Sequence, residues 1–144
     1  MIVLDTMVVS EPMRHGPDLA VESWLDRQDP GSLFITAVTV GELLLGAELL
    51  PNGKRKTVLS RAIGELVNDT FRDRILDFDL RAATQLATRM ATARRSGVAV
   101  SMSDGQIAGM AATRGFAVAT RDVQPFSALG LTVINPWSDE TRSS

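Results

Sequence analysis

The first residues of this chain place a carboxylate directly after a short apolar run. Residues 2–4 are Ile, Val and Leu, and Asp5 follows them at once. Aliphatic runs of this kind are typical of strands that are buried on both faces of a parallel sheet. Ligands of open α/β folds bind at the carboxyl ends of such strands. We therefore predict that Asp5 lies at a functional edge of a sheet. Because the strand begins at residue 2, we also expect no leader peptide.

Short apolar runs alternate with helical periodicity along the rest of the chain. Strands are expected at 2–4, 33–37, 74–79, 117–122 and 132–135, and helices at 17–29, 38–50, 54–71, 80–96 and 103–113. This alternation indicates βαβ units and a mostly parallel sheet with helices on both faces. We predict one α/β domain over residues 1–137 and a flexible polar tail at 138–144.

The amino-acid composition indicates the cellular environment that the protein suits and the kinds of partner that it could bind. The chain has 144 residues, no cysteine and a net charge of −2. The absence of cysteine excludes disulfides and thiolate metal sites, and it fits a reducing cytoplasm. No basic, apolar leader pattern and no 18-residue apolar stretch is present, so we expect no membrane span. A nucleic-acid partner would have to meet local basic groups or bound metal ions, because the chain as a whole is not basic.

Four acidic residues from separate segments are expected to meet at one edge of the sheet. Asp5 and Asp122 end the first and fourth expected strands, Asp104 opens a helix, and Glu42 lies one turn into the helix after the second strand. Taken singly, Asp104 also suits a helix dipole and Asp122 a turn, while Glu42 also suits a solvated helix face. Asp5 is different, because a carboxylate after a buried strand needs a partner or a cation.

Carboxylates crowded together repel one another, and some take up protons near neutral pH unless a cation is bound. The candidate ligands here are all oxygens, and the one histidine, His15, falls in a predicted loop. Oxygen donors favour Mg²⁺ or Mn²⁺ over zinc. A cation of this kind suits hydrolysis of a phosphodiester, because it activates water and stabilises charge on the phosphate.

Four short segments resemble, in order and spacing, the acidic motifs of the PIN-domain family. The segments are Leu4–Thr6, Thr39–Leu43, Ser103–Ala108 and Ala119–Asp122. The run at 9–12 and the ending at 135–137 are similar to those of FitB-like members. Within the family, the chain therefore resembles most closely the VapC and FitB toxins of type II toxin–antitoxin systems.

This resemblance implies a three-layer PIN-like α/β fold with a central five-stranded parallel sheet flanked by helices. It implies an Mg²⁺- or Mn²⁺-dependent endoribonuclease, a hydrolase that cleaves RNA and acts as a toxin. The implied partners are a second copy in a homodimer and a cognate antitoxin whose basic C-terminal segment lies over the acidic pocket. DNA would be met only through the antitoxin, and no membrane is involved.

The resemblance also implies roles for particular residues. Carried over by position, the acidic quartet is Asp5, Glu42, Asp104 and Asp122. Asp5 and Asp104 are the family's usual metal ligands, and Asp122 would bind the metal directly or through water. Thr6 and Thr120 would hold hydrogen bonds that orient these carboxylates.

One position departs from the family pattern. Asparagine usually follows the Asp-Thr pair, and here that residue is Met7. Because methionine lacks an amide, we expect altered site geometry or weaker metal affinity, in a site that is tuned or impaired. An alternative is a non-catalytic binding module whose acidic pocket receives a basic antitoxin peptide. A phosphoacceptor domain is disfavoured, because it needs a lysine after its last strand and no lysine follows Lys56.

Overall fold

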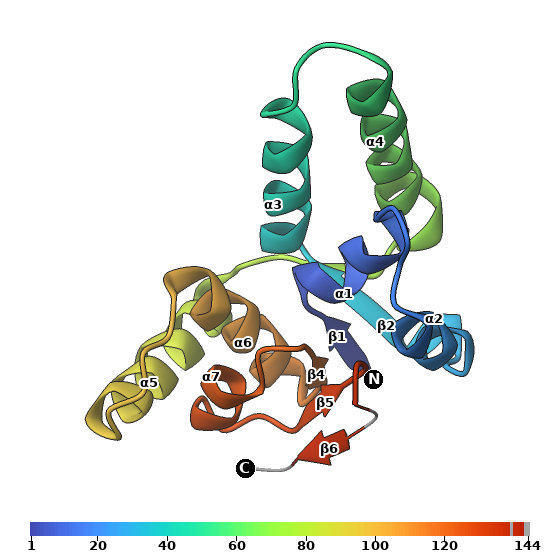
Figure 1. The fold of residues 1–144 in the computed structure, drawn as a ribbon. Coiled ribbons are helices and arrows are strands. Elements are labelled where there is room, and N and C mark those ends of the chain that lie inside the picture. Colours follow the sequence, from blue (N-terminus) through green and yellow to red (C-terminus); the bar gives the residue numbers. More distant parts are fainter. Residues whose placement is uncertain (139, 143–144) are drawn as a thin grey trace.

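A six-stranded sheet in the order β3-β2-β1-β4-β5-β6 runs through the centre of the computed structural model (Figure 1). The structure describes residues 1–138 and 140–142. The strands are β1 (Ile2–Leu4), β2 (Leu33–Thr36), β3 (Ile75–Leu76), β4 (Ala117–Ala119), β5 (Val133–Asn135) and β6 (Glu140–Arg142). Strands β1 to β5 are parallel, which confirms the predicted five-stranded parallel sheet. Strand β6 adds an antiparallel edge beside β5.

The strand order reverses beside β1. Ile2 of β1 lies opposite Leu33 of β2 on one side and Ala117 of β4 on the other. The chain thus winds outward from β1 in both directions, which makes the β1–β4 boundary the switch point of the sheet. In open α/β sheets the ligand crevice lies at that point, beyond the carboxyl ends of the strands. Asp5 and Thr120 directly follow these two strands.

Helices cover both faces of the sheet. They are α1 (Thr6–Ser10), α2 (Leu19–Asp26), α3 (Ala37–Glu48), α4 (Lys54–Glu65), α5 (Leu80–Arg95), α6 (Met102–Arg114) and α7 (Val123–Ala128), with short turns η1 (Glu11–Met13), η2 (Pro30–Ser32) and η3 (Leu66–Thr70). Val3 packs with α5, α6 and α7 in one buried cluster, and its neighbour Leu4 packs with α1 to α4 in another. Successive strand residues point to opposite faces, so β1 contributes to both cores of the three-layer fold.

Several helix ends follow local signals in the sequence. Asp18 and Asp79 accept hydrogen bonds from backbone amides in the first turns of α2 and α5, which is the usual role of an N-cap aspartate. Gly97 and Gly115 have φ angles of 77° and 69° after α5 and α6. Glycine adopts this left-handed conformation without steric cost, and both glycines were predicted to end these helices.

The structure departs from the predicted elements in four places. Residues 6–10 form a true helix where only loose turns were expected, and α7 was not predicted. The third strand is only Ile75–Leu76, because Asp79 serves as the cap of α5. Of the tail predicted at 138–144, residues 140–142 form β6, while 139 and 143–144 lie outside the described residues.

Helices α5 and α6 pack closely. The sequence places Ala83, Ala87 and Ala91 in one row with Ala82, Leu86 and Met90 beside it, and we expected the small residues of that row to allow a close approach. Ala83 and Ala91 are half-buried, but the expectation is wrong for Ala87, which is exposed. The buried residues of α5 are Ala82, Met90 and Ala93. A Cβ on Gly109 of α6 would lie 2.5 Å from the backbone oxygen of Ala82. The glycine on α6 therefore permits the close contact.

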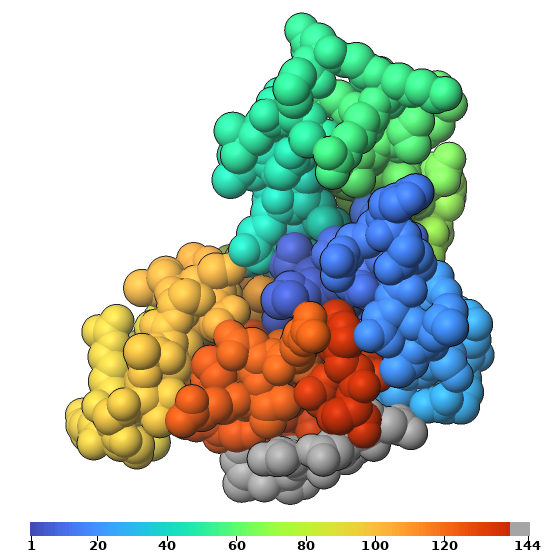
Figure 2. All heavy atoms as spheres, in the orientation of Figure 1, coloured from blue at the N-terminus to red at the C-terminus, as the bar shows by residue number. Residues whose placement is uncertain are grey.

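The α3–α4 hairpin projects from the rest of the molecule, with the N-terminal segment against its base (Figure 2). Four exposed apolar residues lie on this hairpin: Leu44 and Leu45 of α3, Leu49 directly after α3, and Val58 of α4. Among the described residues, no helix combines the length and the hydrophobicity that a membrane span requires.

Candidate active site

Asp5 lies at the carboxyl end of β1 and is only 6% exposed. One carboxylate oxygen, Oδ1, accepts a hydrogen bond from the Thr6 amide at 2.8 Å, and Oδ2 accepts one from the Thr120 hydroxyl at 2.8 Å. Burial raises the pKa of Asp5, these two hydrogen bonds lower it, and the nearby Glu42 and Asp122 carboxylates raise it again. The carboxylate is thus held in one orientation at a desolvated position.

Thr120 links the first and last acids of the quartet. Its side chain is fully buried directly after β4, where its hydroxyl donates to Asp5 and also accepts the Asp122 amide at 3.0 Å. The same hydroxyl therefore fixes a carboxylate on β1 and the backbone of Asp122.

Replacing Thr120 with the isosteric Val is expected to lower the free energy of unfolding by about 1–3 kcal/mol, because a buried carboxylate oxygen loses its donor. Urea unfolding of the purified variant measures this change. Thr120→Ser is the matched control, because it keeps the hydroxyl and removes only a methyl group. Equal stability losses in the two variants would contradict a role for the hydroxyl.

Glu42 projects from α3 and is exposed, yet its orientation is constrained. The Thr6 hydroxyl donates to Glu42 Oε1 at 2.7 Å and lies 3.0 Å from the Thr39 hydroxyl. Helix α3 itself begins where Thr36 Oγ1 accepts the Thr39 amide at 3.1 Å. Thr6 thus contacts two acids, through its amide to Asp5 and through its hydroxyl to Glu42.

Asp104 occupies the first turn of α6, and Ser101 is the N-cap residue of this helix. Its amide donates to Ser101 Oγ at 3.1 Å. The pKa of Asp104 is raised to about 6: burial is the largest cause, the charges of Asp5, Asp122 and Glu42 also raise it, and the hydrogen bond with Ser101 lowers it. Since all three of those carboxylates act on Asp104, the structure brings the four predicted acids into one electrostatic group.

The donor chemistry of this group fits a hydrated divalent cation. In the described part of the chain, none of the four carboxylates forms an ion pair with a lysine, arginine or histidine. Among the described residues, no group of three or more Asp, Glu or His side chains is arranged to hold a metal ion. Mg²⁺ commonly keeps several waters and binds only one or two carboxylates, so an open arrangement of oxygen donors suits it. The same arrangement does not suit zinc, which prefers closed nitrogen and sulfur sites.

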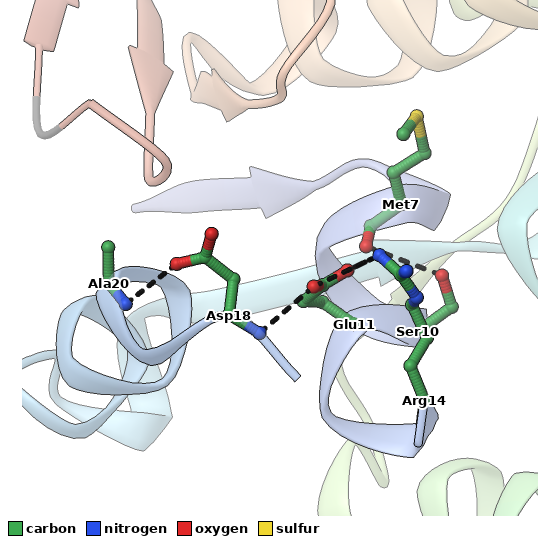
Figure 3. Close-up of polar contacts among 6 residues, drawn as sticks. All are labelled: Met7, Ser10, Glu11, Arg14, Asp18 and Ala20. Carbon is green, nitrogen blue, oxygen red and sulfur yellow. Dashed lines mark hydrogen bonds and ion pairs between the residues drawn. The ribbon is translucent and has the colours of Figure 1, made fainter. Parts of the chain in front are cut away.

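Met7 follows the Asp5–Thr6 pair on α1, and its side chain is 46% exposed. In Figure 3 this side chain points away from the neighbouring polar cluster, and only its backbone oxygen takes part, accepting the Ser10 hydroxyl at 3.3 Å. Among the described residues, the thioether thus makes no polar contact with the acidic quartet.

The sequence interpretation missed Glu11, a buried carboxylate close to the site. Glu11 is 4% exposed and accepts Arg14 Nη1 at 3.0 and 3.2 Å and the Asp18 amide at 3.1 Å (Figure 3). These bonds join η1 to the start of α2. The available signal was an acid followed three residues later by an arginine, which is a spacing that allows contact within one helical turn.

A family model described as PIN domain matches residues 2–130 of the chain. The chain belongs to the PIN-domain family. Among similar PIN proteins, a VapC ribonuclease of Sinorhizobium fredii is 45% identical over 95% of this chain and 98% of its own length. The toxin FitB of Neisseria gonorrhoeae is 41% identical over 96% of this chain and all of its own length. These matches confirm the resemblance to VapC and FitB toxins.

Solved structures agree with this placement. A FitAB complex bound to a DNA fragment superposes with a TM-score of 0.91 at 40% identity, covering 95% of this chain and 96% of the other. The FitAcB structure from Neisseria gonorrhoeae superposes with a TM-score of 0.90 at 41% identity, covering 95% of this chain and 99% of the other. A DNA-bound VapBC from Salmonella typhimurium, at 24% identity and a TM-score of 0.72 over 94% of this chain and 97% of its own, supports the PIN fold alone.

Proposed function

We propose that this PIN domain is a divalent-metal-dependent endoribonuclease that acts as the toxin of a toxin–antitoxin pair. The observation that supports this most is the group formed by Asp5, Glu42, Asp104 and Asp122, which combines mutual repulsion with the lack of a cationic partner among described residues. A protein retains such a group at a cost in stability. Relatives named as a ribonuclease and as a toxin, similar over nearly the whole chain, favour the same function.

In the proposed site, Asp5 and Asp104 would hold the cation directly, and Asp122 would hold it directly or through water. A bound Mg²⁺ or Mn²⁺ would supply an activated water and would stabilise charge on the phosphate. Thr120 and Thr6 fix the carboxylates on which this arrangement depends. Glu42 would complete the ligand set or orient the attacking water. The Thr6 hydroxyl donates to Oε1 of Glu42, and the carboxylate keeps further lone pairs that could accept a hydrogen bond from water.

The proposed partners follow from the same charges. An antitoxin with a basic C-terminal segment would complement the acidic quartet, and the similar solved structures include toxin–antitoxin complexes on DNA. We propose that this chain also meets DNA only through its antitoxin, forms a homodimer and works in the cytoplasm.

The direct test is incubation of the purified protein with transfer, ribosomal and messenger RNA in Mg²⁺, in Mn²⁺ and in excess EDTA. We expect cleavage with either cation, its loss in EDTA, and its recovery when the cation is added back. Glu42→Gln should reduce cleavage. Glu48→Gln, which alters an exposed acid on the same helix, should not.

Two results would contradict the proposal. Cleavage that persists in excess EDTA would exclude a metal-dependent reaction. Tight binding of the antitoxin, with no RNA products in either cation, would instead favour a non-catalytic binding module. In that case we would attribute the loss of cleavage activity to Met7.

A further inference from the structure

A groove of about 1020 Å³ opens beside the acidic quartet. Thr6 and Glu42 lie at its acidic end, and its walls come from the α1–η1 segment on one side and from α3 and the start of α4 on the other. Figure 1 shows that α3 runs away from the sheet and that α4 returns from the tip of the hairpin, so the start of α4 lies near the tip and the α1–η1 segment lies near the base. Leu43 and Leu59 contribute an apolar surface to the groove. The groove is therefore continuous with the site and partly apolar.

The charges along this groove are opposite to those of the quartet. Arg14, His15 and Arg55 line it, and Glu42 is the one carboxylate among its lining residues. Arg55 is exposed, and no hydrogen bond or ion pair joins it to another described residue. Its guanidinium is therefore available to a ligand in the groove.

The Arg14 guanidinium can also contact a ligand in the groove, but it is already bonded to Glu11 on one nitrogen. Its side chain is 60% exposed, and only Nη1 is bonded to Glu11. Glu11 is itself buried and held by the Asp18 amide, as Figure 3 shows. The buried carboxylate therefore fixes one edge of the guanidinium and leaves Nη2 and Nε for another acceptor. Arg14 is thus oriented before any ligand binds.

We propose that this groove binds the single-stranded RNA segment next to the scissile phosphate, with Arg14 and Arg55 contacting flanking phosphates. The inference rests on the proposed ribonuclease function. Four carboxylates repel a phosphate backbone, and a bound cation offsets that repulsion only at the scissile position. Flanking phosphates need cations of their own, and the planar guanidinium matches phosphate oxygens in pairs. The apolar surface suits the face of a base.

The same charges argue against a basic antitoxin segment in this groove, because Arg14 and Arg55 would repel it. Such a segment would be attracted to the acidic quartet and would leave the groove to RNA. Arg14 and Arg55 are therefore proposed as substrate-positioning residues, with no part in the chemical step.

The test compares Arg55→Glu with Arg61→Glu, because both change an exposed arginine of α4 and only Arg55 lines the groove. Binding of a short single-stranded RNA of mixed sequence is measured in an Asp104→Asn background, where turnover is suppressed. Arg55→Glu should weaken binding about tenfold, the expected size of a lost charge-assisted contact. The slope of log Kd against log salt should fall by about 0.7 for one lost phosphate contact.

In cleavage assays without the Asp104 substitution, Arg55→Glu should raise KM and leave kcat nearly unchanged. Arg61→Glu should match the parent protein in every measurement. Arg14→Lys should show a smaller loss of RNA affinity than Arg14→Gln, because lysine keeps the charge.

The outcomes separate this inference from the proposed function. If the parent cleaves RNA and Arg55→Glu binds and cleaves it equally well, the groove assignment is overturned and the ribonuclease stands. If Arg55 governs RNA binding and the parent cleaves nothing, the groove is supported and the catalytic proposal fails. If the Asp104→Asn protein binds no RNA and the parent neither binds nor cleaves it, both are overturned. If Arg55→Glu loses affinity for polyglutamate but not for RNA, the groove suits an acidic protein segment instead.

Discussion

Asp104→Asn is expected to lower the rate of RNA cleavage roughly 100-fold or more and, in metal-free protein at neutral pH, to raise the melting temperature. The two effects have one cause. Burial and the neighbouring carboxylates raise the pKa of Asp104 to about 6 from its ordinary value of 3.8. The ionised side chain is therefore disfavoured in the folded, metal-free protein, although it is the form that would bind a cation.

The pH dependence of this stabilisation follows from the direction of the shift. A carboxyl group whose folded-state pKa exceeds its unfolded-state value binds protons more tightly in the folded state, so stability is lost as pH rises. For Asp104 the loss occurs between pH 3.8 and about 6, and it persists at neutral pH. Below pH 3.8 the Asp104 side chain of the parent is protonated in both the folded and the unfolded state. The stability advantage of the Asp104→Asn variant should therefore disappear. Thermal melts in EDTA across this range measure the effect.

At neutral pH, added Mg²⁺ should make the parent more stable than the Asp104→Asn variant, because a ligand that binds only the folded state stabilises that state. The parent should gain more in melting temperature than Asp104→Asn. Asp77→Asn, which removes an exposed aspartate after β3, should change neither cleavage nor the response to Mg²⁺. Unchanged cleavage by Asp104→Asn, or a lower metal-free melting temperature at neutral pH, would contradict the role given to Asp104.

Gly109→Ala is expected to lower the free energy of unfolding by about 3 kcal/mol, at the upper end of overpacking costs. The added Cβ would lie 2.5 Å from the Ala82 backbone oxygen and 3.4 Å from the Leu86 nitrogen. Neither atom can move away without a shift of α5 relative to α6. The effect should therefore exceed the gain of about 1 kcal/mol that alanine brings to a helix interior. Urea unfolding measures the net change.

Gly105→Ala is the matched control for this substitution, because both glycines are buried on α6. A Cβ on Gly105 would meet the side chain of Met90, and methionine adapts its rotamers readily. We expect a clearly smaller loss of stability than for Gly109→Ala. If the two variants lost equal stability, the backbone contact at Ala82 would not be the controlling one. Because α6 carries Asp104 in its first turn, Gly109→Ala should also reduce cleavage by the protein that remains folded.

Local signals determined much of the fold. A strand that ends in Asp5, glycines after the helices and aspartate caps each act within a few residues, so the sequence alone indicates them. The same holds for the order of strands and helices, which produced the predicted parallel sheet. Short elements escaped prediction because five or six residues, as in α1 and α7, carry too little periodicity. Isolated helices of that length are also unstable, so tertiary packing decides whether they form.

The sequence indicated the four acids as candidates because each lies at or near the end of an expected element, and the chain order predicted that those ends meet at one edge of the sheet. Which surfaces face one another depended on tertiary structure. The sequence did not show which residues of this side of α5 become fully buried, because contact with α6 buries Ala82 and leaves Ala87 exposed. The groove beside Glu42 requires α4 to fold back along α3, and α3 to pack against α1. Arg14 and Arg55 are 41 residues apart in the chain, and no local signal specifies that both line the same groove.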